Sequence, residues 1–190
     1  MRVISGKAKG HKLRRVPGDS TRPVTDRVKE NLFNILGDWV IGTSWLDLFA
    51  GTGQVGIEAL SRGAEHAVFV DSSRAAIRTI KTNLEHTQLS PNASVLHRNA
   101  FTILNGGIST PFDVVYVAPP QYKGIWIETL NIIDGIQQTI LESEGLVIVQ
   151  IDPAEYVDLE LQNLSLGDRR KYGKTLLCFY ETIEDYSTSS

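Results

Sequence analysis

A glycine-rich loop between a short apolar segment and a helical segment constrains the fold of this chain most. The run SWLDLF (44–49) predicts a buried strand and leads into Gly51, Gly53 and Gly56, which match the pattern G-x-G-x-x-G. Asp71 follows Gly51 by twenty residues, at the end of a second predicted strand. This order is typical of α/β sheets that bind a nucleoside cofactor at the strand ends. A tight strand-to-helix turn that binds no ligand would require the same glycines. The residues that flank the loop must therefore distinguish a cofactor site from a plain turn.

The alternation of strands and helices continues toward the C-terminus. Strands separated by helices predict a mostly parallel α/β sheet with helices on both faces, which is a Rossmann-like fold. The expected helices cover 53–62, 74–88 and 124–141, and the expected strands cover 66–71, 93–98, 113–117 and 145–151, with further strand candidates at 161–166 and 175–181.

The N-terminal segment is strongly basic, although the whole chain has a net charge of −3. Residues 1–30 hold nine Lys and Arg against three Asp and Glu. We expect a basic arm over 1–24 with room for a short hairpin, a domain over 25–182 that opens with a helix at 25–38, and a disordered polar tail over 183–190. A basic arm on an acidic body favours a nucleic-acid partner, and a merely solubilising arm is the alternative. The residues expected to contact RNA are Arg2, Lys7, Lys9, Lys12, Arg14, Arg15, Arg22 and Arg27.

Composition limits the compartment and the classes of site. Cys178 is the single cysteine, so no internal disulfide can form, which is typical of the cytoplasm or an organelle matrix. No apolar run of about eighteen residues occurs, so we expect no membrane span. The four histidines lack ligand spacing, and we expect no metal site. Nothing in the chain demands a partner copy, and we expect a monomer.

Asp47 distinguishes between the candidate cofactors. This carboxylate stands four residues before Gly51, where it would repel the diphosphate of a nicotinamide dinucleotide. It suits the ammonium and sulfonium of S-adenosylmethionine, whereas Asp71 suits the two ribose hydroxyls. The alternatives are that Asp47 merely caps a turn, or that the glycine pattern and Asp71 belong to a nicotinamide oxidoreductase.

The end of the third predicted strand adds two further candidates. Asn99 can accept from the adenine amino group and Phe101 can pack on its ring, although both also suit an ordinary loop. The residues expected to bind the cofactor are Asp47, Phe49, Gly51, Thr52, Gly53, Asp71, Asn99, Ala100 and Phe101.

Several segments together resemble one known family. LDLFAGTGQVGIEAL (46–60), VFVD (68–71) and the two prolines and tyrosine after the fourth strand look like amino-group methyltransferases. RPVTDRVKENLFNIL (22–36), preceded by VISGKAKGHKL, and KYGKTLLCFYE (171–181) resemble the small-subunit ribosomal RNA guanine-N2 methyltransferases, the RsmD family. The likeness covers about residues 2–181.

The resemblance implies a Rossmann-like, class I S-adenosylmethionine-dependent methyltransferase with a seven-stranded sheet whose last strand is antiparallel. It implies methyl transfer to the exocyclic N2 amine of a guanine in small-subunit ribosomal RNA, either free or in the assembled subunit. Asn99 stands where the family usually has an acid. The positions that match the cofactor motifs are Asp47, Gly51, Gly53 and Asp71, and those that match the N-terminal signature are Arg22, Thr25, Asp26, Arg27 and Glu30.

The fourth motif departs from the family pattern. Ala118 replaces the usual Asp or Asn, and Gln121 stands where an aromatic residue is expected, one place before Tyr122. An exocyclic amine is a poor nucleophile until its hydrogens are accepted, and losing one oriented acceptor costs about 2–4 kcal/mol of transition-state stabilisation. Gln121 Oε1 and Asp47 are the candidate replacements. The catalytic candidates are Pro119, Pro120, Gln121 and, as a platform for the target base, Tyr122. The alternative is a weakened or inactive homologue that binds RNA or assists ribosome assembly.

Overall fold

The structure, a computed structural model, describes residues 1–18, 23–106 and 108–183. None of the described helices is long and apolar enough to cross a membrane. The strands are β1 (Ser44–Asp47), β2 (His66–Asp71), β3 (Ala93–His97), β4 (Phe112–Val117), β5 (Leu141–Ile151), β6 (Leu164–Tyr172) and β7 (Thr175–Thr182). The helices are α1 (Asp26–Leu36), α2 (Gln54–Ser61), α3 (Arg74–Thr87), α4 (Ala100–Asn105), α5 (Ile125–Gly135) and α6 (Gln137–Ile140), with short 3-10 turns at Gly37–Val40, Ser90–Asn92 and Pro153–Glu155.

The seven strands form one sheet in the order β3-β2-β1-β4-β5-β7-β6. The five strands from β3 to β5 pair in parallel, and β7 runs antiparallel to both β5 and β6. This arrangement confirms the predicted fold class, including the reversed last strand. It also places the C-terminal ends of β1, β2 and β4 side by side at one edge, where ligands bind in such sheets.

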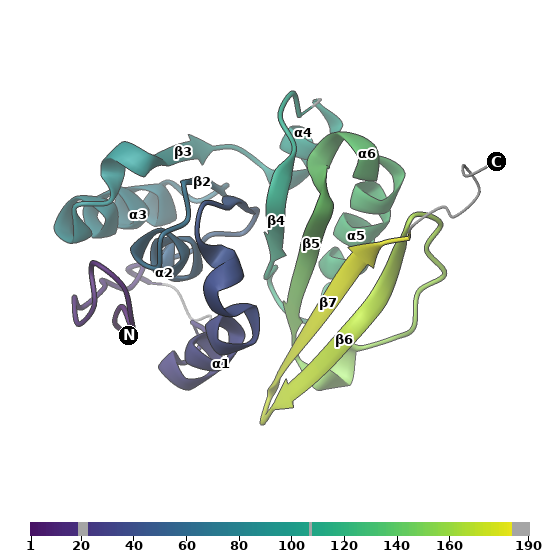
Figure 1. The fold of residues 1–190 in the computed structure, drawn as a ribbon, viewed down its shortest axis with the longest axis horizontal. Coiled ribbons are helices and arrows are strands. Elements are labelled where there is room, and N and C mark those ends of the chain that lie inside the picture. Colours follow the sequence, from purple (N-terminus) through teal and green to yellow (C-terminus); the bar gives the residue numbers. More distant parts are fainter. Residues whose placement is uncertain (19–22, 107, 184–190) are drawn as a thin grey trace.

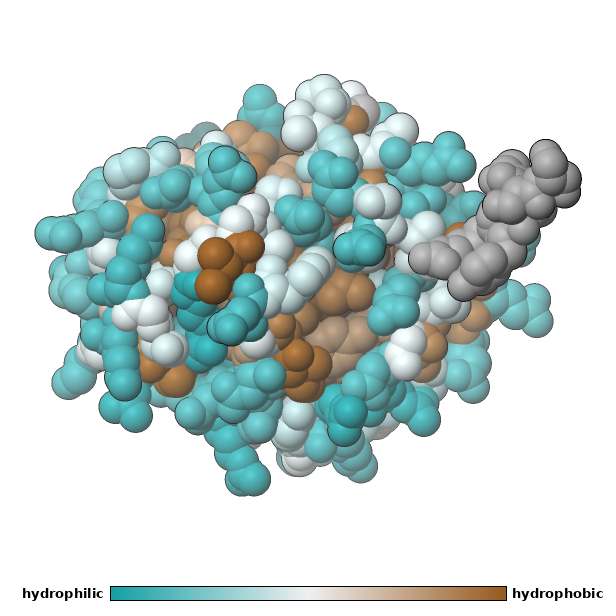
Figure 2. All heavy atoms as spheres, in the orientation of Figure 1, coloured by the Kyte–Doolittle hydropathy of each residue, from teal (hydrophilic) through white to brown (hydrophobic). Residues whose placement is uncertain are grey.

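Two apolar layers cover the faces of the sheet. Helices α1, α2 and α3 pack on one face, where Phe33 stacks on Trp45 with ring centroids 5.5 Å apart. Helices α4, α5 and α6 pack on the other face, around Trp126 and Leu130 (Figure 1). The face of the molecule drawn in Figure 2 is mostly hydrophilic, with an apolar area between α1 and the strands β5 and β7. The alternation of strands and helices therefore produces the three-layer architecture that the sequence predicts.

Four elements differ from the sequence-based expectation. The helix predicted over 124–141 is interrupted after Gly135, and β5 begins at Leu141, four residues before the predicted start. The strand candidate at 161–166 is wrong in its bounds, because β6 continues to Tyr172 by pairing with β7. Its second half is polar and lacks apolar alternation, so only the pairing reveals it. Helix α4 was not predicted, since it has six residues and depends on a cap from Asn99.

The N-terminal segment forms a small hairpin that packs against α2. Arg2 and Lys12 form an antiparallel bridge, and the Lys7 amide donates to the Ser61 carbonyl at 2.8 Å. Its apolar side chains belong to the same core as α1 and α2, so the basic arm is fixed on the domain. The buried residues of this segment are Val3, Ala8, Leu13 and Val16.

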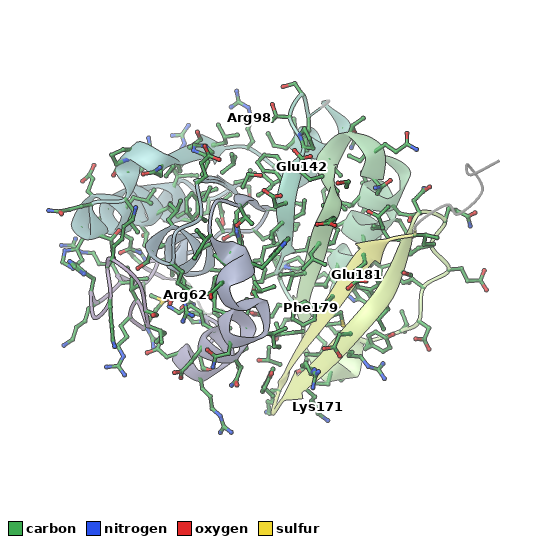
Figure 3. The ribbon with its side chains drawn as sticks, viewed as in Figure 1. Arg62, Arg98, Glu142, Lys171, Phe179 and Glu181 are labelled. Atoms are coloured by element: carbon green, nitrogen blue, oxygen red, sulfur yellow. The ribbon has the colours of Figure 1, made fainter. Side chains whose placement is uncertain are left out.

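A buried ion pair lies beneath this hairpin. Glu58 of α2 pairs with Lys29 of α1 at 3.3 Å, and both side chains are fully buried. The Glu58 carboxylate also accepts hydrogen bonds from the backbone N–H groups of Ile4 and Ser5, at 2.8 and 3.0 Å. Arg62, which lies beside α1 and α2 in Figure 3, donates to it at 2.8 Å. One carboxylate therefore joins the arm to two helices.

Replacing Gly6 by Ala is expected to detach the hairpin from α2. Gly6 has a φ of +81°, and a Cβ there would overlap the Ser61 carbonyl oxygen. We expect a loss of about 1–3 kcal/mol in the free energy of unfolding, measured with denaturant, and faster hydrogen exchange at the Lys7 amide. Gly10→Ala is the control, because Gly10 also has a positive φ but faces open space. Equal losses in the two variants would show that the steric overlap is irrelevant.

Candidate active site

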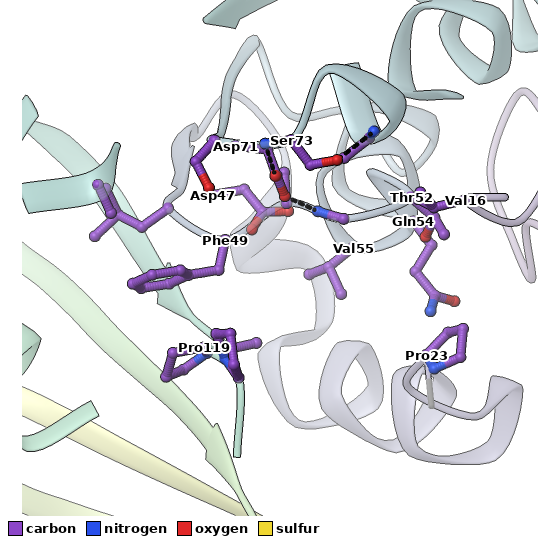
Figure 4. Close-up of a pocket in the computed structure, with 18 of the residues that line it drawn as sticks. Val16, Pro23, Asp47, Phe49, Thr52, Gln54, Val55, Asp71, Ser73 and Pro119 are labelled. Atoms are coloured by element: carbon purple, nitrogen blue, oxygen red, sulfur yellow. Dashed lines mark hydrogen bonds between the residues drawn. The ribbon is translucent and has the colours of Figure 1, made fainter. Parts of the chain in front are cut away.

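A crevice of about 670 Å³ opens at the C-terminal ends of β1, β2, β4 and β5. Its floor holds Asp47 and Asp71, which point toward the same part of the crevice (Figure 4). Pro119 lies on one side, and Pro23 of the N-terminal segment lies at the other end. The sheet order thus brings together residues that are up to about a hundred positions apart in the chain.

Asp47 is a buried acid that lacks a full set of partners. Its side chain is 2% exposed, and Oδ1 has no hydrogen-bond partner among the described residues. Burial and, to a smaller extent, the nearby Asp71 carboxylate raise the pKa of Asp47 from 3.8 to about 8, although the backbone N–H groups of Gly56 and Phe49 oppose this shift. A cation in the crevice would stabilise the ionised form.

Asp71 organises the glycine loop. Its two carboxylate oxygens accept from the backbone N–H groups of Gly51 and Ser73, at 2.9 and 2.8 Å. Gly51 lies at a φ of +55° and lines the crevice, where a Cβ would meet no other atom within 4 Å. Gly53 caps α2 with a φ of +76° and does not line the crevice, so its place in the motif is explained by backbone conformation. Each oxygen of Asp71 keeps a lone pair for a ligand hydroxyl.

Gln54 is a crevice residue that the sequence analysis missed. Its Nε2 donates to the Val24 carbonyl at 3.0 Å, and its buried Oε1 has no partner among the described residues. A polar residue at the first position of a helix usually faces solvent, and only the packing of the N-terminal segment against α2 buries this one. Gln54 Oε1 and Asp47 Oδ1 are thus two unpartnered acceptors in one crevice.

The cofactor candidates after β3 divide into lining and non-lining residues. Asn99 and Ala100 line the crevice, and Asn99 Oδ1 accepts from the Phe101 amide at 2.8 Å, which caps α4. Phe101 does not line it. Phe49 and Thr52 do. The adenine contacts of Asn99 and Phe101 remain predictions.

The fourth motif lies at the rim of the crevice. Ala118, Pro119, Pro120 and Gln121 line it, and Tyr122 does not. Tyr122 is 67% exposed and adopts a left-handed φ of 60°. Its amide donates to the Glu155 carboxylate at 2.6 Å. Such a conformation is strained for a tyrosine and marks this turn as a special position. Stacking on a target base remains a prediction.

Seven of the eight basic residues predicted to contact RNA lie in the described part of the chain, and all seven are exposed: Arg2, Lys7, Lys9, Lys12, Arg14, Arg15 and Arg27. The eighth, Arg22, lies outside the described residues. Lys29, which also contributed to the basic count, is buried against Glu58 and adds nothing to this surface. A second groove, of about 360 Å³, is lined by Arg14, Arg15 and Arg78. It shares Pro17 and Ala75 with the crevice, so the two lie side by side.

Comparison with known proteins identifies the family. The model of the family described as Conserved hypothetical protein 95 matches residues 1–181. The chain belongs to this family. It is 39% identical over 183 residues to the Bacillus subtilis protein named "Putative rRNA methyltransferase YlbH", covering 95% of this chain and 98% of that protein. It is 34% identical to Ribosomal RNA small subunit methyltransferase D of Escherichia coli, covering 95% of this chain and 89% of that protein.

Solved structures agree with this membership of the Conserved hypothetical protein 95 family. The structure titled "Putative methyltransferase yhhF from Escherichia coli" has a TM-score of 0.83 and 34% identity, covering 96% of this chain and 97% of that chain. An RNA methyltransferase from Salinibacter ruber, in complex with S-adenosyl-L-homocysteine, has a TM-score of 0.63 at 12% identity, covering 88% of this chain and 98% of that chain. At 12% identity, the likeness to the Salinibacter ruber protein shows only a shared fold, the class I methyltransferase fold.

The crevice fits S-adenosylmethionine as the cofactor. Its ammonium group needs an acceptor, and the buried Asp47 Oδ1 is unpartnered among the described residues there. Its ribose needs an acceptor for hydroxyls, and Asp71 supplies one. A dinucleotide diphosphate fits poorly, because two carboxylates line the same crevice. The residues of this member of the family therefore favour a cationic methyl donor over a nicotinamide dinucleotide.

Proposed function

We propose that this protein transfers a methyl group from S-adenosylmethionine to the exocyclic N2 amine of a guanine in small-subunit ribosomal RNA. The observation that carries the proposal is the unpartnered, buried Asp47 carboxylate in a crevice that also contains the Pro119-Pro120 strand end. The name of the Escherichia coli relative, which is 34% identical, supports the small-subunit substrate.

When bound, the cofactor supplies an electrophilic methyl group on a sulfonium. The residues of the chain then have three tasks. Asp47 holds the ammonium end of the donor, and Asp71 holds the sugar. The rigid Pro119-Pro120 turn presents a carbonyl at the place where the target amine must be oriented.

RNA binding is proposed to follow the exposed basic residues of the N-terminal segment. Phosphate contacts from Lys and Arg give affinity without base selection. The groove of Arg14, Arg15 and Arg78 adjoins the crevice, so a backbone phosphate there would lie close to a base in the crevice. Base choice would come from the crevice itself, acting on an unpaired nucleotide.

The decisive experiment is methylation of undermethylated small ribosomal subunits, and of the free RNA, with radiolabelled S-adenosylmethionine. The expected product is N2-methylguanosine, identified by mass spectrometry of the digested RNA. Label in another nucleoside would contradict the proposed target. Tight cofactor binding without any label in RNA would instead favour a non-catalytic RNA-binding or assembly protein, the alternative that Ala118 supports.

Reversing the charge of Arg78 is expected to weaken RNA binding. Arg78→Glu should lower RNA affinity by about tenfold at moderate salt and reduce the slope of log K against log salt, because a phosphate contact is lost. Fluorescence anisotropy of labelled RNA at several salt concentrations measures both. Lys81→Glu is the matched control, since Lys81 is exposed on the same helix but does not line the groove. Equal effects of the two variants would indicate a general charge effect instead of a phosphate site.

A further inference from the structure

Two polar side chains of the crevice have no part in the function proposed so far. Gln150 of β5 and Tyr116 of β4 both line the crevice, and the Tyr116 hydroxyl hydrogen-bonds Gln150 Oε1 at 2.5 Å. Neither belongs to a motif that the sequence analysis singled out. Both lie in the sheet close to Ala118, the position at which the proposed mechanism lacks a hydrogen-bond acceptor.

The strand register puts Gln150 beside Ala118. Val117, the last residue of β4, pairs with Val149 of the parallel strand β5; Ala118 directly follows β4, and Gln150 is the next residue of β5. Neighbouring strands lie about 4.8 Å apart, and residues level with each other in a parallel pair face the same side. Ala118 packs against the layer of α1 and α2, to which Tyr116 also belongs. A carboxamide on β5 therefore stands next to the methyl group that replaces the family's polar side chain.

Tyr116 fixes the orientation of this carboxamide. The Tyr116 side chain is 2% exposed, so its hydroxyl proton requires a partner, and Gln150 Oε1 is the acceptor within reach. Burial and the Asp47 carboxylate raise the pKa of Tyr116, so the phenol keeps this proton at neutral pH. Gln150 Oε1 has two lone pairs, and one of them remains free for a second donor.

The other candidate acceptors serve this task less well. Asp47 is assigned to the ammonium end of the donor. Gln121 is exposed at the rim, and within the described part of the chain no hydrogen bond of its side chain orients it. Gln150 is partly buried and held by a neighbour.

We propose that Gln150 Oε1 accepts a hydrogen of the target amine, in place of the acceptor that Ala118 cannot provide, and that Tyr116 is its positioning residue. This inference rests on the proposed function. In the transfer, the lone pair of the amine nitrogen forms the N–C bond, the S–C bond of the donor breaks with its electron pair left on sulfur, and one N–H proton passes to water. Gln150 holds the nitrogen in a pyramidal geometry and stays neutral throughout.

The test compares four variants on the same RNA. Gln150→Leu removes the acceptor and should lower kcat by about 100-fold with an unchanged Kd for S-adenosylmethionine. Gln150→Glu keeps an oxygen acceptor and should retain activity within about tenfold of the unaltered protein. Tyr116→Phe should lower kcat by about tenfold, and it should have no further effect when combined with Gln150→Leu.

Rescue separates a chemical role from a structural one. Ala118→Asn restores a polar side chain on β4 and should recover most of the activity of Gln150→Leu, which a merely structural role of Gln150 would not allow. Unchanged kcat in Gln150→Leu, or a loss that Ala118→Asn does not relieve, would overturn the inference while leaving the proposed function intact. An unaltered protein that places no methyl group on guanine would overturn both.

Discussion

Replacing Asp47 by Asn is expected to lower the affinity for S-adenosylmethionine by about 100-fold while making the protein without cofactor more stable. Asp47 is 2% exposed, and its Oδ1 lacks a partner among the described residues. The cationic donor loses a buried counter-ion in the variant, which costs about 3 kcal/mol. The unliganded protein, in contrast, no longer carries an uncompensated acid. Function and stability are therefore opposed at this position.

The pH dependence follows from the raised pKa of Asp47. The folded protein holds the Asp47 proton up to a pKa of about 8, whereas the unfolded chain releases it near the ordinary value of 3.8. The contribution of Asp47 to stability is thus lost as the pH rises from about 4 to 8, on the order of 4 kcal/mol at pH 7. Asp47→Asn lacks this dependence and should show a Tm higher by roughly 10 °C at pH 7.

The affinity for S-adenosylmethionine should rise with pH, whereas the stability of the unliganded protein falls. Below pH 8 the protonated Asp47 must lose its proton to meet the cation, so the affinity for S-adenosylmethionine rises with pH by up to about tenfold per unit. Calorimetry in two buffers of different ionisation enthalpy would measure this release, which should approach one proton at pH 6.5 and vanish in Asp47→Asn. Asp38→Asn, at an exposed position, is the control. An affinity of Asp47→Asn within tenfold of the unaltered protein would refute the assignment of Asp47 to the donor.

Replacing Glu58 by Gln is expected to destabilise the fold by about 3–5 kcal/mol. Glu58 compensates the fully buried Lys29 and also accepts from the Ile4 and Ser5 amides. Burial lowers the pKa of Lys29, and the Glu58 carboxylate opposes that effect. Breaking a buried pair by neutralising one partner leaves the other charge without compensation, which is more costly than losing a surface pair.

Denaturant unfolding measures this loss, and hydrogen exchange at Ile4 and Ser5 reports whether the arm detaches first. Glu85→Gln is a suitable control, since Glu85 is an exposed residue of α3. The Glu58→Gln substitution keeps the size of the side chain, so a cavity cannot explain the result. A loss below about 1 kcal/mol would mean that apolar packing and the Lys7–Ser61 hydrogen bond suffice to hold the arm on α2.

The sequence by itself determined the layered fold and which cofactor candidates meet at one edge of the sheet. Apolar strands separated by helices dictate a parallel sheet, and the strand ends of such a sheet must meet, so Asp47, Gly51 and Asp71 were identified as one site from their positions in the chain. These inferences depend on local periodicity and on the direction of strands. Both are properties of short segments, and both are visible in the residues.

Only the tertiary structure decided which polar side chains complete the site. Gln54 lines the crevice because the N-terminal segment packs over α2, and Gln150 stands beside Ala118 because β5 pairs with β4 in one particular register. The second half of β6 is a strand only through its pairing with β7, and Lys29 is a core residue only because Glu58 lies opposite. Register and burial arise from contacts between segments that are distant in sequence, so no local pattern of residues encodes them.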